Sequence, residues 1–216
     1  MPQIQFWLFQ SDIRVLREYH ERVQEFLQAQ IEKFNDEFNE SLEDQLELDR
    51  GWDIDNEIDR FNELSEEMPA ILRTTVLVAA YSRLEALLLS LCDGFRGLKQ
   101  LQLAPKDLRD SGIFAAKTYF TKVAHVSFPS DTSEWAEFQF VNKLRNILVH
   151  SDGRVKPTND TLCDQIADDP RLSVTDSGYL QLTDAFVDQT LELIGRFANL
   201  VQKAVESGDP NRNGRA

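Results

Sequence analysis

The chain contains little cysteine, proline and glycine. Its 216 residues include 2 Cys, 7 Pro and 9 Gly. Cys92 and Cys163 stand far apart in the sequence, without a paired spacing and without a histidine at ligand distance. Neither a disulfide framework nor a zinc site is indicated, and a reducing, cytoplasmic compartment is expected. No metal ion and no cofactor are predicted.

Long apolar runs are also missing. The N-terminal stretch MPQIQFWLFQ is short, lacks a basic start and lacks a small-residue cleavage site. The longest uninterrupted apolar run elsewhere is too short to span a bilayer. These features predict a soluble protein without a membrane partner.

Basic residues are scarce, with 23 Lys and Arg against 37 Asp and Glu and a net charge of −14. The distribution is uneven: residues 1–68 hold 19 acidic and 6 basic residues, whereas residues 113–156 hold 4 and 6. Because Lys and Arg supply most non-specific affinity for nucleic acids, a promiscuous RNA binder is disfavoured. A local anion site in the second segment is still permitted.

A long amphipathic helix is predicted near the N-terminus. From Ser11 to about Asp49 there is no glycine or proline, and apolar residues recur every three or four positions, as on the buried face of a helix. Ser11 is a suitable N-cap, and RGWD at 50–53 is a suitable stop. About 38 residues at 1.5 Å each would span about 57 Å, so part of this helix is expected to project or bend.

Further helices are predicted along the rest of the chain. The segment DNEIDRFNELSEE leads to Pro69, and the following segment to Gly94 is apolar on nearly all sides, which is typical of a central helix. One or two short helices should end at Pro129, and SDTSEWAEFQFVNKLRNILVH begins with capping residues. The closing helix has Thr183 as its cap.

Only one strand signal is present. A polar loop is expected from Ser151 to Pro170, and LSVTDSGYLQLT then predicts a small hairpin. The predicted fold is all-α, an up-and-down helical bundle with a long N-terminal helix and one small β-hairpin before the last helix. We expect residues 1–68 to form the long acidic helix and a connecting helix packed on the bundle, 69–207 to form the helical domain, and 208–216 to form a disordered tail.

The sequence KLRNILVHSDG, residues 143–153, combines Arg145, Asn146 and His150 within one and a half helical turns. In a helix, Asn146 and His150 share a face, whereas Arg145 and His150 lie about 140° apart around the axis. We therefore expect the three side chains to converge only if the helix end opens. Gly153 can supply the left-handed conformation that ends a helix.

These residue types suit metal-free RNA cleavage. The reaction needs a base for the 2′-hydroxyl proton, an acid for the leaving 5′-oxygen and a cation for the phosphoryl oxygens. Histidine suits the first two tasks and arginine the third. One chain offers a single histidine here, because His20 and His125 stand in unrelated contexts. A two-fold dimer would bring two copies of the Arg145 and His150 pair to one cleft.

The motif RNILVH resembles the Arg-polar-x-x-x-His motif of HEPN domains, and AAYSRLEALLLSLC resembles the helix that precedes it in that family. HEPN domains are all-helical proteins of toxin–antitoxin, abortive-infection and CRISPR systems. The resemblance covers roughly residues 70–205, while the acidic first helix has no counterpart. It implies a metal-independent, dimeric endoribonuclease of phage defence or a toxin, with an antitoxin or sensor protein as a partner. Arg145 and His150 would be essential, and Asn146 would orient them.

Supporting roles are predicted for several nearby charges. Arg83 and Glu85 are expected to form a structural or supporting ion pair, because charged groups on an apolar central helix are seldom left unpaired. Lys143, Arg154 and Lys156 are expected to contact RNA.

Two simpler interpretations remain open. Arg145 could form a structural ion pair with Glu85 while His150 merely caps the helix, and the chain could be a non-catalytic module whose acidic helix docks a protein. Tyr81, Tyr119 and Trp135 are expected in the core.

Overall fold

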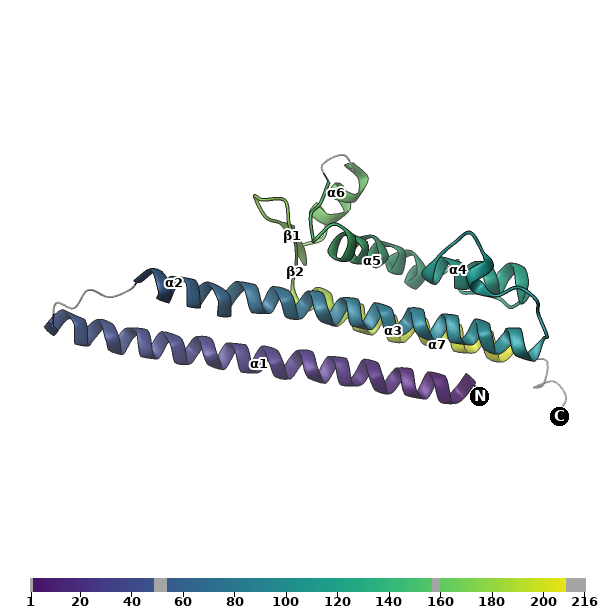
Figure 1. Cartoon of the computed structure of the whole chain (residues 1–216), viewed down its shortest axis with the longest axis horizontal. Helices are drawn as coiled ribbons and strands as arrows, with labels where there is room; N and C mark the ends of the chain where they lie inside the picture. The colour runs from purple at the N-terminus through teal and green to yellow at the C-terminus, as the bar shows by residue number, and fades with distance from the viewer. Residues whose placement is uncertain (1, 49–53, 157–159, 209–216) are drawn as a thin grey trace.

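The computed structural model describes residues 2–48, 54–156 and 160–208. It confirms an all-α bundle with a long N-terminal helix and one hairpin before the last helix (Figure 1). The elements in chain order are α1 (Pro2–Leu48), α2 (Ile54–Asn62), α3 (Met68–Leu98), α4 (Gly112–Thr118), α5 (Ser133–His150), α6 (Asp160–Ala167), β1 (Leu172–Val174), β2 (Leu180–Leu182) and α7 (Asp184–Gly208).

Helix α1 begins nine residues earlier than predicted, and Ser11 lies inside it rather than at its N-cap. The reason is that Phe6 and Phe9 continue the buried face of Ile13 toward the N-terminus, and all three belong to the core. The predicted stop at 50–53 lies outside the described residues. Gln5 Nε2 donates a hydrogen bond to Ser90 Oγ of α3 at 2.7 Å, which shows that α1 packs on the bundle.

Helices α2 and α3 form one continuous helical segment. The π-helical turn Glu63–Glu67 joins them immediately before Pro69. Because proline has no backbone N–H, it cannot donate to the carbonyl four residues earlier, and a widened turn accommodates this gap. The predicted boundary between residues 68 and 69 therefore falls inside a helix rather than in a linker.

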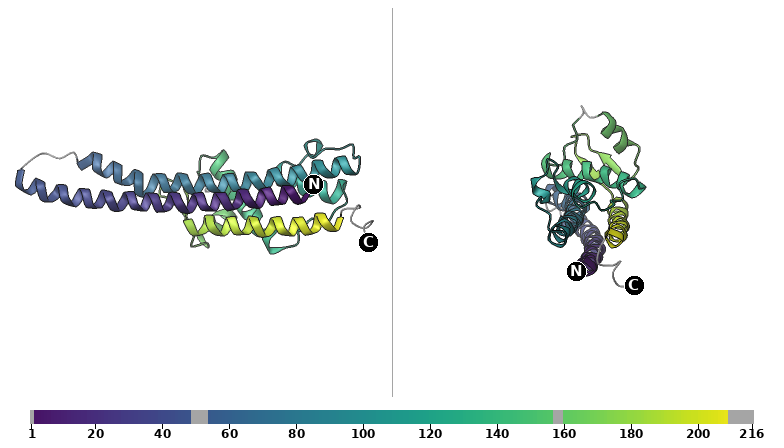
Figure 2. Two further views of the ribbon diagram at one scale, coloured as in Figure 1. Left: turned by 90° about the horizontal axis from the view of Figure 1, so that it is seen from below. Right: turned by 90° about the vertical axis from the view of Figure 1, so that its right-hand side faces the viewer.

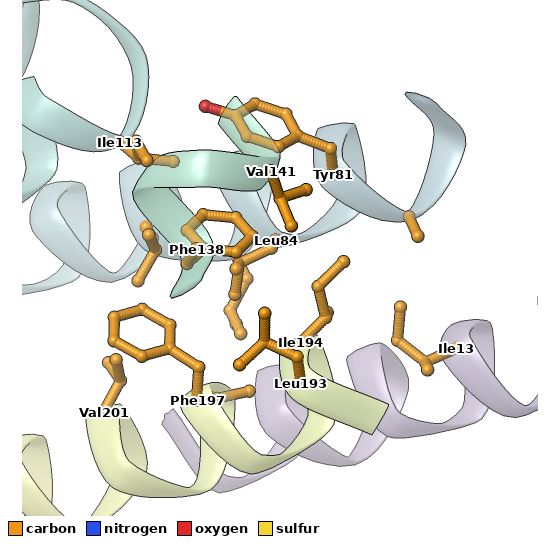
Figure 3. Packing of buried hydrophobic residues seen from close by; sticks show 14 of the residues in the cluster. Ile13, Tyr81, Leu84, Ile113, Phe138, Val141, Leu193, Ile194, Phe197 and Val201 are labelled. Carbon is orange, nitrogen blue, oxygen red and sulfur yellow. The ribbon is translucent and has the colours of Figure 1, made fainter. Parts of the chain in front are cut away.

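The core lies where α3, α5 and α7 meet (Figure 3). The ring of Phe138 from α5 stacks between Tyr81 of α3 and Phe197 of α7, with centroid distances of 5.3 and 5.7 Å. Tyr81, Tyr119 and Trp135 are all buried, as the sequence predicted. This aromatic stack fixes α5 across the two long helices and so positions the end of α5.

The second half of α1 and the start of α2 extend beyond α7 as a two-helix arm (Figure 2). The ring of Phe34 lies 5.8 Å from that of Phe61, so apolar contact between the two helices continues into the arm. The expected projection of the N-terminal helix is therefore confirmed.

The segment between α5 and the hairpin is not entirely loop. Residues Asp160–Ala167 form α6, which the sequence interpretation missed. Leu162 and Ile166, four positions apart, are buried and supply the apolar side of this short helix. The hairpin was predicted correctly: β1 pairs with β2, and Gly178 has a φ of 86° in its turn. Gly208 ends α7, and the rest of the predicted disordered tail lies outside the described residues.

The continuous helix Asn56–Leu98 is long and apolar enough to cross a membrane, judged by length and composition alone. The prediction of no membrane span considered only uninterrupted apolar runs, and α2 and α3 were not expected to join into one helix. Half of its most apolar window is buried inside the structure. The core helix of a soluble protein passes the same test, so the feature is weak evidence for a membrane span.

Candidate functional site

Helix α5 delivers the Arg145 motif to one end of the bundle. Its N-terminus is capped by Thr132, whose Oγ1 accepts a hydrogen bond from the backbone N–H of Trp135 at 3.3 Å. At the other end, the N–H groups of Ser151 and Gly153 both donate to the carbonyl of Ile147. Gly153 has a φ of 76°, which confirms the predicted left-handed stop.

Arg145, Asn146 and His150 converge at this end. Arg145 Nη1 donates to Asn146 Oδ1 at 3.1 Å and lies 3.4 Å from His150 Nε2. The expectation that the helix must open first is wrong, because α5 remains helical through His150. The long arginine side chain instead reaches around the helix to the imidazole. His150 is exposed and Arg145 is half-buried, so a ligand can approach the pair.

The ring of Tyr81 supports the Arg145 guanidinium. The guanidinium carbon lies 5.1 Å from the ring centroid, within the range of a cation–π contact. The Tyr81 hydroxyl donates to Asn142 Oδ1 at 2.6 Å. Burial, and secondly the charge of Glu85, raise the pKa of Tyr81 well above its usual range despite the opposing effect of Arg145. The phenol is therefore a neutral donor, and its ring is a fixed platform.

Arg145 has no carboxylate counter-ion among the side chains that the structure describes. The proposed structural ion pair with Glu85 is therefore not formed. Nε of Arg145 is buried and makes no hydrogen bond within the described part of the chain. A half-buried cation without a carboxylate partner is electrostatically incomplete, and an anion would complete it.

The structure does not bring Arg83 to this site. Its Nε pairs with Asp12 Oδ2 of α1 at 3.6 Å. Of the two predicted roles, Arg83 therefore has the structural one, with Asp12 rather than Glu85 as its partner. Glu85 lies one turn after Tyr81. Its carboxylate faces the start of α4, where Oε1 would be 3.2 Å from a Cβ built on Gly112. Glu85 acts on the site through the charge it places near Tyr81.

The three predicted RNA-binding residues do not surround Arg145 as one group. Lys143 points toward α6, where Nζ donates to Gln165 Oε1 at 3.2 Å, whereas Arg145 points toward α3. Arg154 lies over the ring of Tyr179 at 5.0 Å, and its Nε donates to the Tyr179 hydroxyl at 3.2 Å. Lys156 is exposed.

Tyr179, the partner of Arg154, is a residue that the sequence did not indicate. Gly153 and Val155 form backbone hydrogen bonds with Leu180 and Gly178 of the hairpin. The segment that follows His150 is thereby attached to the hairpin. The alternation of LSVTDSGYLQLT predicted the hairpin, but no sequence signal indicated which segment pairs with it.

Comparison with known proteins gives no match to a family model, a curated protein or a solved structure. Within the described residues, no group of three or more His, Cys, Asp or Glu side chains could hold a metal ion.

Proposed function

We propose that the chain is a metal-independent endoribonuclease of the HEPN type, acting in phage defence or as a toxin. The observation that carries the proposal is the contact between Arg145 and His150 on an accessible surface, with no carboxylate paired to the arginine. A scissile phosphate is the kind of anion that an uncompensated guanidinium accommodates.

The chemistry follows from the two side chains. A neutral imidazole of His150 accepts the proton of the RNA 2′-hydroxyl as the 2′-oxygen attacks the adjacent phosphorus. The bond from phosphorus to the 5′-oxygen breaks, and a second imidazole protonates that oxygen. The products are a 2′,3′-cyclic phosphate and a 5′-hydroxyl. Arg145 stabilises the charge on the phosphoryl oxygens, and Asn146 Oδ1 orients the guanidinium.

The second imidazole and guanidinium would come from another copy of the chain, which makes the site a composite at a dimer interface. Among the described residues, His150 is the one histidine at this end of α5. His125 lies in the segment after α4, and His20 is buried where α1 packs on the bundle. A two-fold axis beside the α5 ends would supply the missing acid.

The test is cleavage of tRNA and mRNA in EDTA. The His150→Ala variant should lose about 10²–10⁴-fold in rate, since it removes the general base. Arg145→Ala should lose about 10²–10³-fold, because charge on the phosphoryl oxygens is then uncompensated. Wild-type products should carry 2′,3′-cyclic phosphate ends.

Two matched variants serve as controls. His125→Ala removes an exposed histidine away from α5, and Arg83→Ala removes an exposed arginine that pairs with Asp12. Both should cleave at the wild-type rate. Cleavage that survives both site substitutions would rule out the proposed mechanism.

A second candidate is a non-catalytic module that binds a protein through the two-helix arm. The observation that favours it is the acidity of the arm, where Glu32, Asp36 and Glu40 are exposed and, among the described residues 30–60, only Lys33 and Arg60 are basic. This candidate predicts no RNA cleavage by the wild-type chain. It also predicts that the triple variant Glu32→Lys, Asp36→Lys and Glu40→Lys binds the partner, an antitoxin or sensor protein, more weakly.

A further inference from the structure

Helix α1 has a second apolar face besides the one in the core. Ile4, Leu8, Val15, Tyr19 and Phe26 are between 51% and 65% exposed. At 100° per residue they fall within an arc of about 60°, and from Ile4 to Phe26 they extend about 33 Å along one side of the helix. Single exposed apolar residues are common on protein surfaces, but five on one side of a helix mark an interaction site. We call this row the α1 stripe.

The α1 stripe lies beside the contact with α3. Gln5 and Asp12, which contact Ser90 and Arg83 of α3, are next to the stripe around the helix. Exposed Trp7, also on α1, widens the apolar surface. In the end-on view of Figure 2, α1 lies beneath α3 and α7, so its outer side is open to a partner.

The exposed area is large enough for a specific interface. With about 200 Å² for each side chain, the middle of the range for aromatic residues, the exposed parts of the stripe with Trp7 amount to roughly 700 Å². A stable protein–protein interface buries about 800 Å² on each partner.

The sequence of the stripe fits a second copy of the same helix running antiparallel. Val15 is midway between Ile4 and Phe26, so a two-fold axis at Val15 would place Ile4 of each chain opposite Phe26 of the other. The same axis would place Leu8 opposite the aliphatic stem of Arg22, and Tyr19 opposite Ser11. Arg22 is the charged residue inside the arc, and Glu18 neutralises it through a contact of 2.6 Å.

Charge also favours the antiparallel arrangement. The acidic arm begins beyond Phe26, so two antiparallel α1 helices would carry their arms past each other's N-termini in opposite directions. A parallel arrangement would place the two arms side by side, which like charges oppose.

We infer that the α1 stripe is a self-association interface at which two copies of the chain pack through antiparallel α1 helices about a two-fold axis at Val15. The inference does not rest on the proposed ribonuclease activity. Helix α5 lies on the other side of α3 and α7 (Figure 1), so this interface leaves Arg145 and His150 uncovered for a separate contact.

The first test is light scattering of the full chain over a concentration series. The wild type should reach at least twice the 24.8 kDa of one chain, because the α5 ends are free to add a separate contact. The double variant Val15→Glu with Tyr19→Glu should raise the dissociation constant by about 100-fold or more, because the interface would bury four carboxylates. The control Val174→Glu, on β1, replaces a comparably exposed valine and should leave the mass unchanged. Circular dichroism checks that each variant is folded.

The second test is disulfide cross-linking in a Cys163→Ser background, in which the remaining Cys92 is buried. Val15→Cys should cross-link to itself, because the two-fold axis brings the two copies together. Ile4→Cys and Phe26→Cys should not cross-link alone but should do so when mixed. A monomeric wild type, a stripe variant that keeps the full wild-type mass, or self-cross-linking of Ile4→Cys would each overturn the inference. Binding of another protein to the stripe of a monomeric chain would overturn it too.

Discussion

At the scale of single residues, the candidate site depends on how Tyr81 holds Arg145. Tyr81→Phe keeps the ring under the guanidinium but removes the hydrogen bond to Asn142. We expect a loss of about 1 kcal/mol in the free energy of unfolding, measured in urea, and near wild-type RNA cleavage.

Tyr81→Leu is the contrasting substitution, because it removes the ring that supports Arg145. Cleavage should fall about tenfold through loss of cation–π positioning, and most of the fall should appear in kcat rather than KM. Equal activity of the Phe and Leu variants would show that Tyr81 has only a packing role.

A second residue-scale feature is the polar cluster where α1, α3 and α7 meet. Buried His20 lies 3.2 Å from Asp188 Oδ1 and 3.4 Å from Asp184 Oδ1, and Arg73 Nε donates to Asp184 at 2.7 Å. Burial alone would raise the pKa of Asp184, but the hydrogen bonds and charge of Arg73, with smaller contributions from Gln24 and His20, hold it below its ordinary value of 3.8.

This lowered pKa predicts the sign of a pH effect. Ionised Asp184 stabilises the fold above its unfolded-state pKa, and the contribution is lost as the pH falls through the lower folded-state pKa. Asp184→Asn should cost about 1 kcal/mol at pH 7, a modest value because the carboxylate is 38% exposed and solvent screens it. The difference from wild type should shrink below about pH 4. Denaturation midpoints of the wild type and the variant at pH 7 and pH 3 measure this difference in stability. A difference at pH 3 as large as at pH 7 would contradict the lowered pKa of Asp184.

At the scale of elements, the end of α5 is set by Gly153 in a left-handed conformation. Gly153→Ala should destabilise the protein by about 1 kcal/mol through backbone strain, because the added Cβ would meet Tyr179 only at an ordinary 3.6 Å. Exposed Gly94 lies in α3, and Gly94→Ala should stabilise by about 0.5–1 kcal/mol, since nothing lies within 4 Å of the added methyl. Urea unfolding of both variants checks that their free energies of unfolding change in opposite directions. Equal stabilities of the two variants would refute the argument from backbone strain.

At the scale of the whole molecule, net charge governs how RNA approaches. With a charge of −14, the chain repels RNA at long range even though Arg145 attracts a phosphate at contact. The Debye length falls from about 30 Å at 0.01 M salt to about 10 Å at 0.1 M. The cleavage rate at low RNA concentration should therefore rise over this range, opposite to the behaviour of a basic nuclease. A steady fall with salt would mean that local basic residues dominate the encounter.

The sequence alone determined the class of fold and most of its elements. Apolar spacing predicted the long helices, Thr132 and Thr183 lie where capping residues were expected, and the Asp-Ser-Gly turn marked the hairpin. These are local properties, since helix periodicity and turn geometry depend on residues close in the chain. Boundaries failed where packing outweighs local signals, as at Ser11, which the buried residues Phe6 and Phe9 carry into the helix.

Only the tertiary structure decided what surrounds Arg145. The sequence placed the arginine and the histidine near each other, but it did not show that Tyr81 supports the guanidinium. Nor did it show that, among the described residues, Glu85 makes no ion pair with Arg145. It also assigned Arg83 to the site, although Arg83 pairs with α1. Such partners lie tens of residues apart in the chain, and which of them meet depends on how the helices pack, because pattern within one helix fixes a face but not its neighbour.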